Sequence, residues 1–296
     1  MIKRFLAAGP VTLAQVFALS IRNFGSIRRV YSADRESHLG RLSRQRPELF
    51  GMVLTPFVSA LWTASRRFDA IIDHCNYVEK TGWPLDVADH DYRRLVELPS
   101  ISPGLHIELA TPRWLTREGL LSLALVEGET LVFSLSFTFG HIDGQLVAYV
   151  GGLQGGADEK APSTNRRLTR LSNGMRPRDL LIETFRILCR YYGVAHIYAI
   201  TDKARVHRSA YLRAREVDPV VMSYDSVWRD RRGKPVEGGF FELPVAPQRR
   251  NYEAIRPNKR AEYRRRYGML DAIEKQIVAT LRKREESRPD EAADAN

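Results

Sequence analysis

Residues 129–156 read ETLVFSLSFTFGHIDGQLVAYVGGLQGG, and this stretch decides the fold class. Its two halves, 129–140 and 145–153, are rich in the β-branched and aromatic residues that favour strands. Asp143 and Gly144 lie between the halves, where a primed hairpin turn needs positive φ angles. The stretch therefore predicts an antiparallel β-hairpin with a glycine-rich segment at the end of its second strand.

The flanking sequence predicts helices before the hairpin and a strand–helix–strand crossover after it. Apolar residues at helical spacing and short β-rich runs mark the other elements. Pro177 suits the first position of a helix, and Gly193 suits its end. The expected elements are helices over 11–24 and 57–80, strands over 105–110 and 120–127, a polar loop over 155–174, a helix over 177–193, a strand over 195–200, a helix over 203–215, strands over 220–228 and 238–245, and a helix over 258–286.

This order predicts the α+β class, with a mixed, largely antiparallel sheet flanked by helices and a helical N-terminal region. It resembles the fold of the acyl-CoA-dependent N-acetyltransferases (the GNAT fold), in which a strand, a phosphate-cradling turn, a helix and a strand form the cofactor site. The predicted divisions are a helical region over 1–95, a GNAT-like sheet domain over 96–248, a basic helix packed on it over 249–286 and a disordered acidic tail over 287–296.

The composition is typical of a globular chain. Of the 296 residues, 44% are hydrophobic and 27% are charged, which is too apolar for wholesale disorder. No run reaches the ~20 apolar residues of a membrane helix, and Gly9 and Pro10 interrupt an N-terminal stretch that begins like a secretion signal. Cys75 and Cys189 are far apart, so no disulfide framework is expected. We expect a cytoplasmic protein, with a place at the periphery of the inner membrane as an open alternative.

Positive charge is in excess, with 46 Lys and Arg against 35 Asp and Glu and a formal charge of +11. Part of it surrounds NGMRPRDLL (173–181), where Arg176 and Arg178 flank the start of the expected helix. A helix N-terminus favours anions, and arginines bind phosphate or carboxylate through charge-assisted hydrogen bonds. The segment indicates an anion site. The alternative is a solvated loop in which Asp179 complements the helix dipole.

The glycine-rich stretch VGGLQGG (150–156) has two interpretations. Gly151, Gly152 and Gly155, with Gln154 beside them, would let the backbone or phosphate of a ligand approach closely. The spacing alone favours the second interpretation, a strand end with a β-bulge followed by a flexible loop. At the helix start over 173–181, the sequence also lacks the Gly-x-Gly or Gly-x-Ala pair that follows an Arg or Gln in the acetyltransferase loop, which argues against coenzyme A as the ligand.

Polar groups suited to acid–base chemistry follow the strand expected over 195–200. Asp202, His207 and Tyr211 are candidate catalytic residues, and the last two share a helix face because they are four residues apart. The alternative is a structural histidine, with Asp202 as a helix cap. No histidine or cysteine pattern has metal-ligand spacing, so no metal site is expected.

The densest basic segment lies over 249–276 and interleaves arginines with tyrosines. Such a pattern can bind a nucleic acid backbone or an anionic membrane surface. An apolar stripe from Tyr267 to Leu281 instead favours a helix docked on the sheet domain with its charges in solvent, which makes nucleic acid the weaker candidate partner. The candidate basic surface consists of Lys259, Arg260, Arg264, Arg265 and Arg266.

Several blocks together resemble the VirK family of Gram-negative bacterial proteins. They are YVGGLQG (149–155), NGMRPRDLL (173–181), the strand GVAHIYAIT (193–201), the segment with His207, Tyr224–Trp228, GGFFELP (238–244) and NKRAEYRRRYGMLD (258–271). They occur in the family's order and cover roughly residues 45–276. The resemblance implies a link to virulence, envelope stress and tolerance of cationic antimicrobial peptides. It supplies no set of catalytic residues.

Two hypotheses follow. In the first, a GNAT-like protein binds an anionic small molecule or an acyl carrier near Gly151–Gly156 and Arg176–Arg178. If this protein is an enzyme, it transfers an acyl or aminoacyl group from a thioester such as acyl-CoA or an acyl carrier, with His207 or Tyr211 moving protons. In the second, a non-catalytic protein uses its basic C-terminal helix to contact RNA or an anionic membrane surface.

Overall fold

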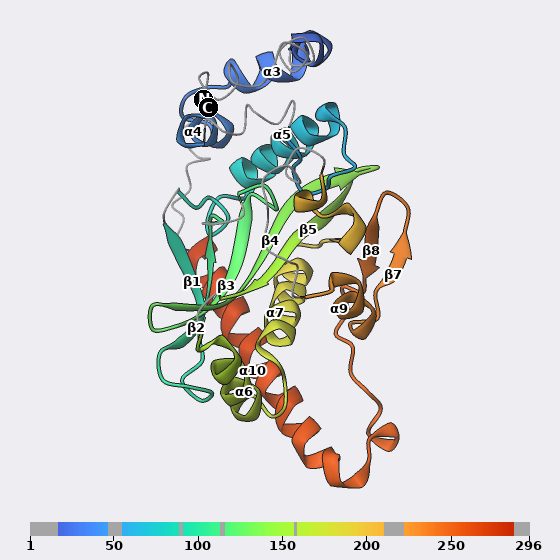
Figure 1. The fold of residues 1–296 in the computed structure, drawn as a ribbon. Coiled ribbons are helices and arrows are strands. Elements are labelled where there is room, and N and C mark those ends of the chain that lie inside the picture. The colour runs from blue at the N-terminus through green and yellow to red at the C-terminus, as the bar shows by residue number, and fades with distance from the viewer. Residues whose placement is uncertain are drawn as a thin grey trace.

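The computed structural model describes residues 17–46, 55–88, 91–112, 116–156, 159–209 and 222–286. In this part of the chain one open eight-stranded sheet is flanked by helices (Figure 1). The predicted α+β class, with a mixed and largely antiparallel sheet, is confirmed. No helix in the described ranges is long and apolar enough to cross a membrane. The predicted domain boundaries stay predictions, and the tail over 287–296 lies outside the described residues.

The sheet is a meander followed by one crossover. Its order is β1-β2-β3-β4-β5-β6-β8-β7. β5 and β6 pair in parallel, and the other neighbouring pairs of this sheet are antiparallel. The strands are β1 (Tyr92–Glu97), β2 (Leu105–Ala110), β3 (Leu121–Glu127), β4 (Thr130–Ile142), β5 (Gln145–Gly155), β6 (His196–Ile200), β7 (Lys234–Val236) and β8 (Phe240–Leu243).

β4 and β5 form the hairpin that residues 129–156 predict. Ile142 pairs with Gln145, and between them Asp143 and Gly144 have φ angles of 51° and 78°. Both values belong to the left-handed region that a primed turn requires. The pairing then runs to Phe133 and Gly155, so this hairpin forms the centre of the sheet.

A β-bulge interrupts β5 at Gly151. Ser136 pairs with Gly152 and Phe137 with Val150, which leaves Gly151 without a partner on β4. The segment before β3 crosses β5 at this point. A Cβ added to Gly151 would lie 2.1 Å from the backbone oxygen of Glu118, and one added to Gly152 would lie 1.7 Å from its Oε2. The predicted bulge is confirmed, and both glycines are needed for packing within the chain.

The long helices pack on the central strands. α7 lies against β3, β4 and β5, and the rings of Phe185 and Phe137 are 4.8 Å apart. α10 packs against α7 and β1. The described helices are α3 (Phe24–Tyr31), α4 (His38–Gln45), α5 (Ala64–Thr81), α6 (Ala161–Leu171), α7 (Pro177–Tyr191), α9 (Tyr224–Asp230) and α10 (Pro257–Glu286), with short 3-10 helices η2 (Asp202–Ala204), η3 (Val206–Arg208) and η4 (Tyr252–Ala254).

α5 covers the part of β4 that extends beyond the end of β3. The last β3–β4 pair joins Leu121 to Phe137, so later residues of β4 have no β3 partner. His74 Nδ1 accepts the N–H of Phe139 at 3.1 Å, and an Asp73 carboxylate oxygen accepts the N–H of His141 at 2.5 Å. Side chains of α5 thus satisfy backbone groups that a neighbouring strand would otherwise bind.

The strand predicted over 220–228 is wrong where the structure describes it. α9 begins at Tyr224, after Ser223, whose Oγ accepts the N–H of Ser226 at 3.3 Å as an N-cap. Tyr224, Val227 and Trp228 are fully buried, and their spacing of three and four residues fits one helix face. The sequence pattern favours a strand here because β-branched and aromatic residues also have high strand propensity.

Three further predictions need correction. The loop over 155–174 contains α6, which has Pro162 near its start and buries Leu168. α5 starts at Ala64 rather than at residue 57, because Thr63 caps it. The helix over 203–215 is replaced up to residue 208 by η2 and η3, and residues 210–221 lie outside the described ranges. β1 is absent from the predicted elements. The helices predicted from 177 and 258 and the strand predicted from 195 are confirmed, and each starts within two residues of the predicted position.

We predict that Gly151→Ala destabilises the protein by roughly 2–4 kcal/mol, because the new methyl group would meet a backbone oxygen that cannot move away cheaply. Gly268→Ala is the matched control, since a Cβ there meets no atom within 4 Å and the position is inside α10. The control should gain about 0.5–1 kcal/mol. Urea unfolding of both variants measures the difference, and equal stabilities would contradict the packing described for β5.

Candidate functional site

The candidate site lies where β5 and β6 part. The parallel pairing ends at Val150 and Ala199, whereas β5 continues to Gly155. The chain leaves β6 after Ile200 and turns into η2. Tyr224, at the start of α9, takes the place of a strand partner: its hydroxyl accepts the N–H of Leu153 at 2.7 Å. The ends of β5 and β6 and the start of α9 therefore meet at one end of the sheet.

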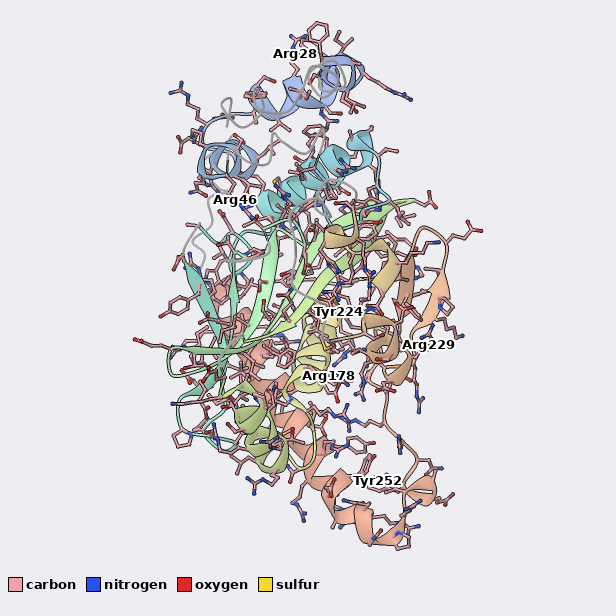
Figure 2. All side chains as sticks on the ribbon, viewed as in Figure 1. Arg28, Arg46, Arg178, Tyr224, Arg229 and Tyr252 are labelled. Atoms are coloured by element: carbon pink, nitrogen blue, oxygen red, sulfur yellow. The ribbon has the colours of Figure 1, made fainter. Side chains whose placement is uncertain are left out.

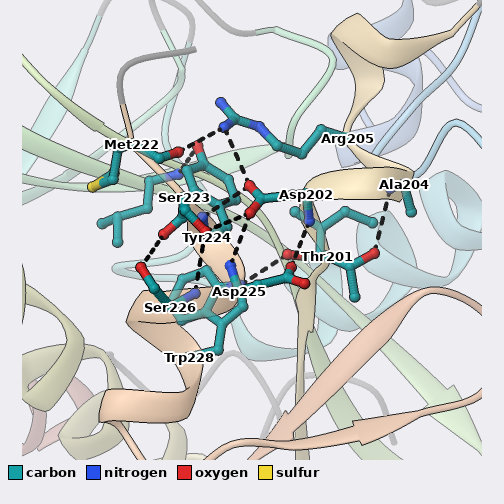
Figure 3. A network of polar contacts seen from close by, with 12 residues as sticks. Thr201, Asp202, Ala204, Arg205, Met222, Ser223, Tyr224, Asp225, Ser226 and Trp228 are labelled. Carbon is teal, nitrogen blue, oxygen red and sulfur yellow. Dashed lines mark hydrogen bonds and ion pairs between the residues drawn. The ribbon is translucent and has the colours of Figure 1, made fainter.

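Asp202 holds the start of α9 (Figure 3). Its carboxylate accepts the N–H of Tyr224 at 2.8 Å and the hydroxyl of Ser223 at 2.7 Å, and its own N–H donates to Asp225 at 2.8 Å. Burial acts to raise the pKa of Asp202, but these hydrogen bonds outweigh it and the pKa is lowered. Asp202 thus caps a helix, in agreement with its interpretation as a helix cap. The helix that it caps is α9, not the predicted helix over 203–215.

Arg205 lies between Asp202 and Tyr224. Its guanidinium carbon is 3.7 Å from the centre of the Tyr224 ring, and one of its nitrogens donates to the carbonyl of Met222 at 3.3 Å. The side chain is buried, and its Nε makes no hydrogen bond. An Asp202 oxygen lies 3.8 Å from the same guanidinium, so the buried charge is paired and Arg205 helps to join Asp202 to the start of α9.

His207 lies on η3 in the same segment. Its Nε2 is buried without a hydrogen-bond partner. Burial, together with the charges of Arg205 and Arg208, lowers the pKa of His207 to about 4, so the imidazole is neutral at pH 7. Tyr211, its predicted partner, lies outside the described residues, and the pairing of the two stays a prediction.

Glu118 is the residue that the sequence did not single out. Its carboxyl group lies on Gly152 of β5 and is 3% exposed, and its Oε2 has no hydrogen-bond partner. Burial raises the pKa of Glu118 to about 8, although nearby Arg205 acts to lower it. The available signal was a carboxylate just before the apolar run 120–126, but the sequence alone does not show that this carboxylate is buried.

A second part of the site is a pocket of about 910 Å³ at the start of α7. Arg176 and Arg178 line it, together with Arg166 and Arg170 of α6. The predicted glycine stretch borders the same place, because Phe133, which also lines the pocket, pairs with Gly155. Gln154 is the neighbouring residue of β5 and pairs with Ser134. Four arginines at a helix N-terminus form a site suited to an anion.

Met222 connects the pocket to the polar cluster. A nitrogen of Arg178 lies 3.6 Å from the Met222 sulfur, and Arg205 binds the carbonyl of the same residue. Arg178 comes from the start of α7 and Tyr224 from the start of α9 (Figure 2). The structure thus brings the predicted anion-binding arginines near Asp202 and Tyr224. Neither His207 nor Gly151 is among the described residues that line the pocket itself.

The basic C-terminal segment is part of a docked helix. Tyr267, Ile273, Ile277 and Leu281 of α10 are buried, as the apolar stripe predicts. Arg266 is half-buried and donates to the carbonyl of Asn173 at 3.0 and 2.8 Å, which ties α10 to the loop before α7. The exposed members of the candidate basic surface are Lys259, Arg260, Arg264 and Arg265.

These features define an α+β protein with one parallel crossover and an arginine-lined pocket beside it. Within that class, the chain belongs to the family described as "Protein of unknown function (DUF535)", whose model matches residues 14–279. No group of three or more His, Cys, Asp or Glu side chains in the described ranges could hold a metal ion.

The chain is similar to proteins of two bacteria. "Uncharacterized protein YbjX" of Escherichia coli (strain K12) is 30% identical over 148 residues, which are 50% of this chain and 44% of the relative, so the match spans less than half of that protein. Two proteins of Haemophilus influenzae (strain ATCC 51907 / DSM 11121 / KW20 / Rd), each named "Uncharacterized protein", are 27% and 26% identical over 228 residues, about three quarters of each chain. No solved structure matches the chain.

We predict that Glu118→Gln makes stability less dependent on pH. In the unfolded chain the carboxyl ionises near pH 4.5, whereas in the folded protein it stays protonated up to about pH 8. Between these values the wild-type protein should lose stability as pH rises, by roughly 1.4 kcal/mol per pH unit from this group, and the amide removes that loss. Urea unfolding between pH 5 and pH 8 measures it.

The control for this prediction is Glu129→Gln in the exposed β3–β4 turn, which should follow the wild-type protein. A constant difference between Glu118→Gln and the wild-type protein across that pH range would show that Glu118 is ionised in the folded state.

Proposed function

We propose that the protein is a GNAT-like transferase that moves an acyl or aminoacyl group from a phosphate-bearing thioester to an acceptor. The observation that carries the proposal is the arginine-lined pocket at the start of α7, beside the place where β5 and β6 part. In line with the VirK resemblance, the process served would be virulence or resistance to envelope stress in a Gram-negative bacterium.

The order of elements supports the GNAT assignment. β5, the segment with α6, helix α7 and β6 follow the strand, turn, helix and strand of the acetyltransferase pattern. β5 carries a bulge at Gly151, and its later residues have no β6 partner. Ligands of sheets with a parallel crossover bind at the carboxyl ends of such strands, which is where the pocket lies.

The pocket fits a phosphate-bearing donor. Arg166, Arg170 and Arg176 are paired with no carboxylate in the salt bridges of the described residues, so their charge is free to bind phosphate oxygens. An acyl carrier or coenzyme A thioester supplies such phosphates together with the reactive acyl group. The sequence departs from the acetyltransferase loop because α7 starts with Arg176-Pro177 rather than after a Gly-x-Gly pair.

The proposed reaction is aminolysis of the thioester. The acceptor nitrogen forms a bond to the carbonyl carbon, the carbon–sulfur bond breaks, and the thiolate leaves. The proton that the nitrogen loses must reach a base and then the thiolate. The neutral imidazole of His207 is the candidate base, and its pKa of about 4 makes it a weak one, whereas Glu118 exchanges its proton near pH 8.

We predict that Arg170→Gln/Arg176→Gln weakens binding of acyl-CoA or acyl carrier protein at least about tenfold, because two charge-assisted contacts to phosphate are lost. Both side chains are exposed, so the fold should be kept. Arg264→Gln/Arg265→Gln is the matched control with the same change in net charge on exposed α10 positions. Isothermal titration calorimetry measures the affinities. Equal losses in both variants, or no binding by the wild-type protein, would overturn the proposal.

The second candidate function is a binding protein that contacts RNA through α10. The supporting observation is that Lys259, Arg260, Arg264 and Arg265 are exposed on the half of α10 that projects beyond the sheet (Figure 1). RNA binding that falls steeply with salt and is lost in Arg264→Gln/Arg265→Gln, but kept in the pocket variant, would favour this function.

A further inference from the structure

An apolar stripe lies on the outside of the N-terminal helical segment. Residues 17–22 are helical, and α3 follows after Asn23, whose N–H donates to the carbonyl of Leu19 and whose carbonyl accepts from Ile27, so helical hydrogen bonds bridge the junction. Phe17, Ile21 and Phe24 are 70%, 61% and 63% exposed. Their spacing of four and three residues places them on one helix face.

The opposite face of this segment is already used. Val30 is buried, and Leu19 and Ile27 pack against the core. Packing within the chain therefore accounts for the inner apolar residues and leaves the outer stripe unexplained. Three large apolar side chains at such exposure on one helix face indicate an interaction surface. Tyr31 follows Phe24 by seven residues, or about two helical turns, and is 64% exposed, so it extends the stripe.

The charged residues within 17–31 are all basic. Arg22, Arg28 and Arg29 are exposed on the same segment. The first acidic residue of the whole sequence is Asp34, so no negative charge accompanies the stripe along the chain. A helix with phenylalanine and isoleucine on one side and arginines beside them has the pattern of helices that lie in the surface of an anionic bilayer.

The position of the segment suits such a contact. α3 lies at one end of the molecule, far from the start of α10 at the other end (Figure 1), and Arg28 projects from it (Figure 2). A bilayer could therefore be reached by Phe17, Ile21 and Phe24 without covering the pocket at α7.

We propose that residues 17–31 form a peripheral membrane-binding surface for anionic phospholipids. The three apolar side chains enter the boundary between headgroups and acyl chains, and the arginines bind lipid phosphates. The surface is separate from the proposed transferase site and from the basic half of α10, so it stands whether or not either function is correct.

The test is sedimentation of the full chain with vesicles of equal parts phosphatidylcholine and phosphatidylglycerol. The wild-type protein should bind these vesicles, bind pure phosphatidylcholine far less, and release as salt rises. Phe17→Ser/Phe24→Ser should reduce binding at least about tenfold, and Arg28→Gln/Arg29→Gln should reduce it less and remove most of the salt dependence.

Ile142→Ser/Leu171→Ser is the matched control, because it removes two exposed apolar side chains elsewhere on the protein and should bind like the wild-type protein. Thermal unfolding of each variant checks that the fold is kept. The proposal is overturned if the wild-type protein does not bind, if Phe17→Ser/Phe24→Ser binds equally well, or if only Arg264→Gln/Arg265→Gln lowers binding. If the wild-type protein forms a concentration-dependent dimer that Phe17→Ser/Phe24→Ser abolishes, the stripe would instead be assigned to contact with a second copy of the chain.

Discussion

The close approach of Glu118 to Gly151 and Gly152 is the constraint on which this end of the fold depends. The segment before β3 passes directly over β5, and there is no room for a Cβ on either glycine. The bulge at Gly151 shifts the register against β4, and the strand beyond it runs on past the end of β6. Tyr224 can then bind the free N–H of Leu153, and Asp202 can fix the helix that carries this tyrosine.

The predicted parts of the fold are those that local sequence determines. The β4–β5 turn needs positive φ at adjacent positions, and Asp143-Gly144 provides them. α7 is long and amphipathic, and α10 has a buried stripe at helical spacing from Tyr267 to Leu281, so the helical period is visible in both. β1 pairs at an edge and has only two buried residues, and α9 is short, so neither left a pattern that local propensity resolves.

The candidate site was predicted only in part, because most of it depends on contacts between distant segments rather than on local sequence. Arg176 and Arg178 are visible because they flank a helix start, which is a local feature. Glu118, Arg205 and Tyr224 matter because separate segments of the chain meet, as the Arg205–Tyr224 contact and the hydrogen bond between Leu153 and Tyr224, 71 residues apart, show. Burial, which raises the pKa of Glu118 and lowers that of His207, exists only in the folded chain.

The edges of the sheet have a consequence for solubility. A strand edge with free N–H and C=O groups can pair with another molecule and begin aggregation. Asp73 and His74 occupy the extended edge of β4, Arg93 and Arg94 lie on the outer strand β1, and Pro235 interrupts the outer strand β7. Each exposed edge of this sheet therefore carries a charge, a proline or a covering helix, and the protein is protected against growing into larger β-assemblies.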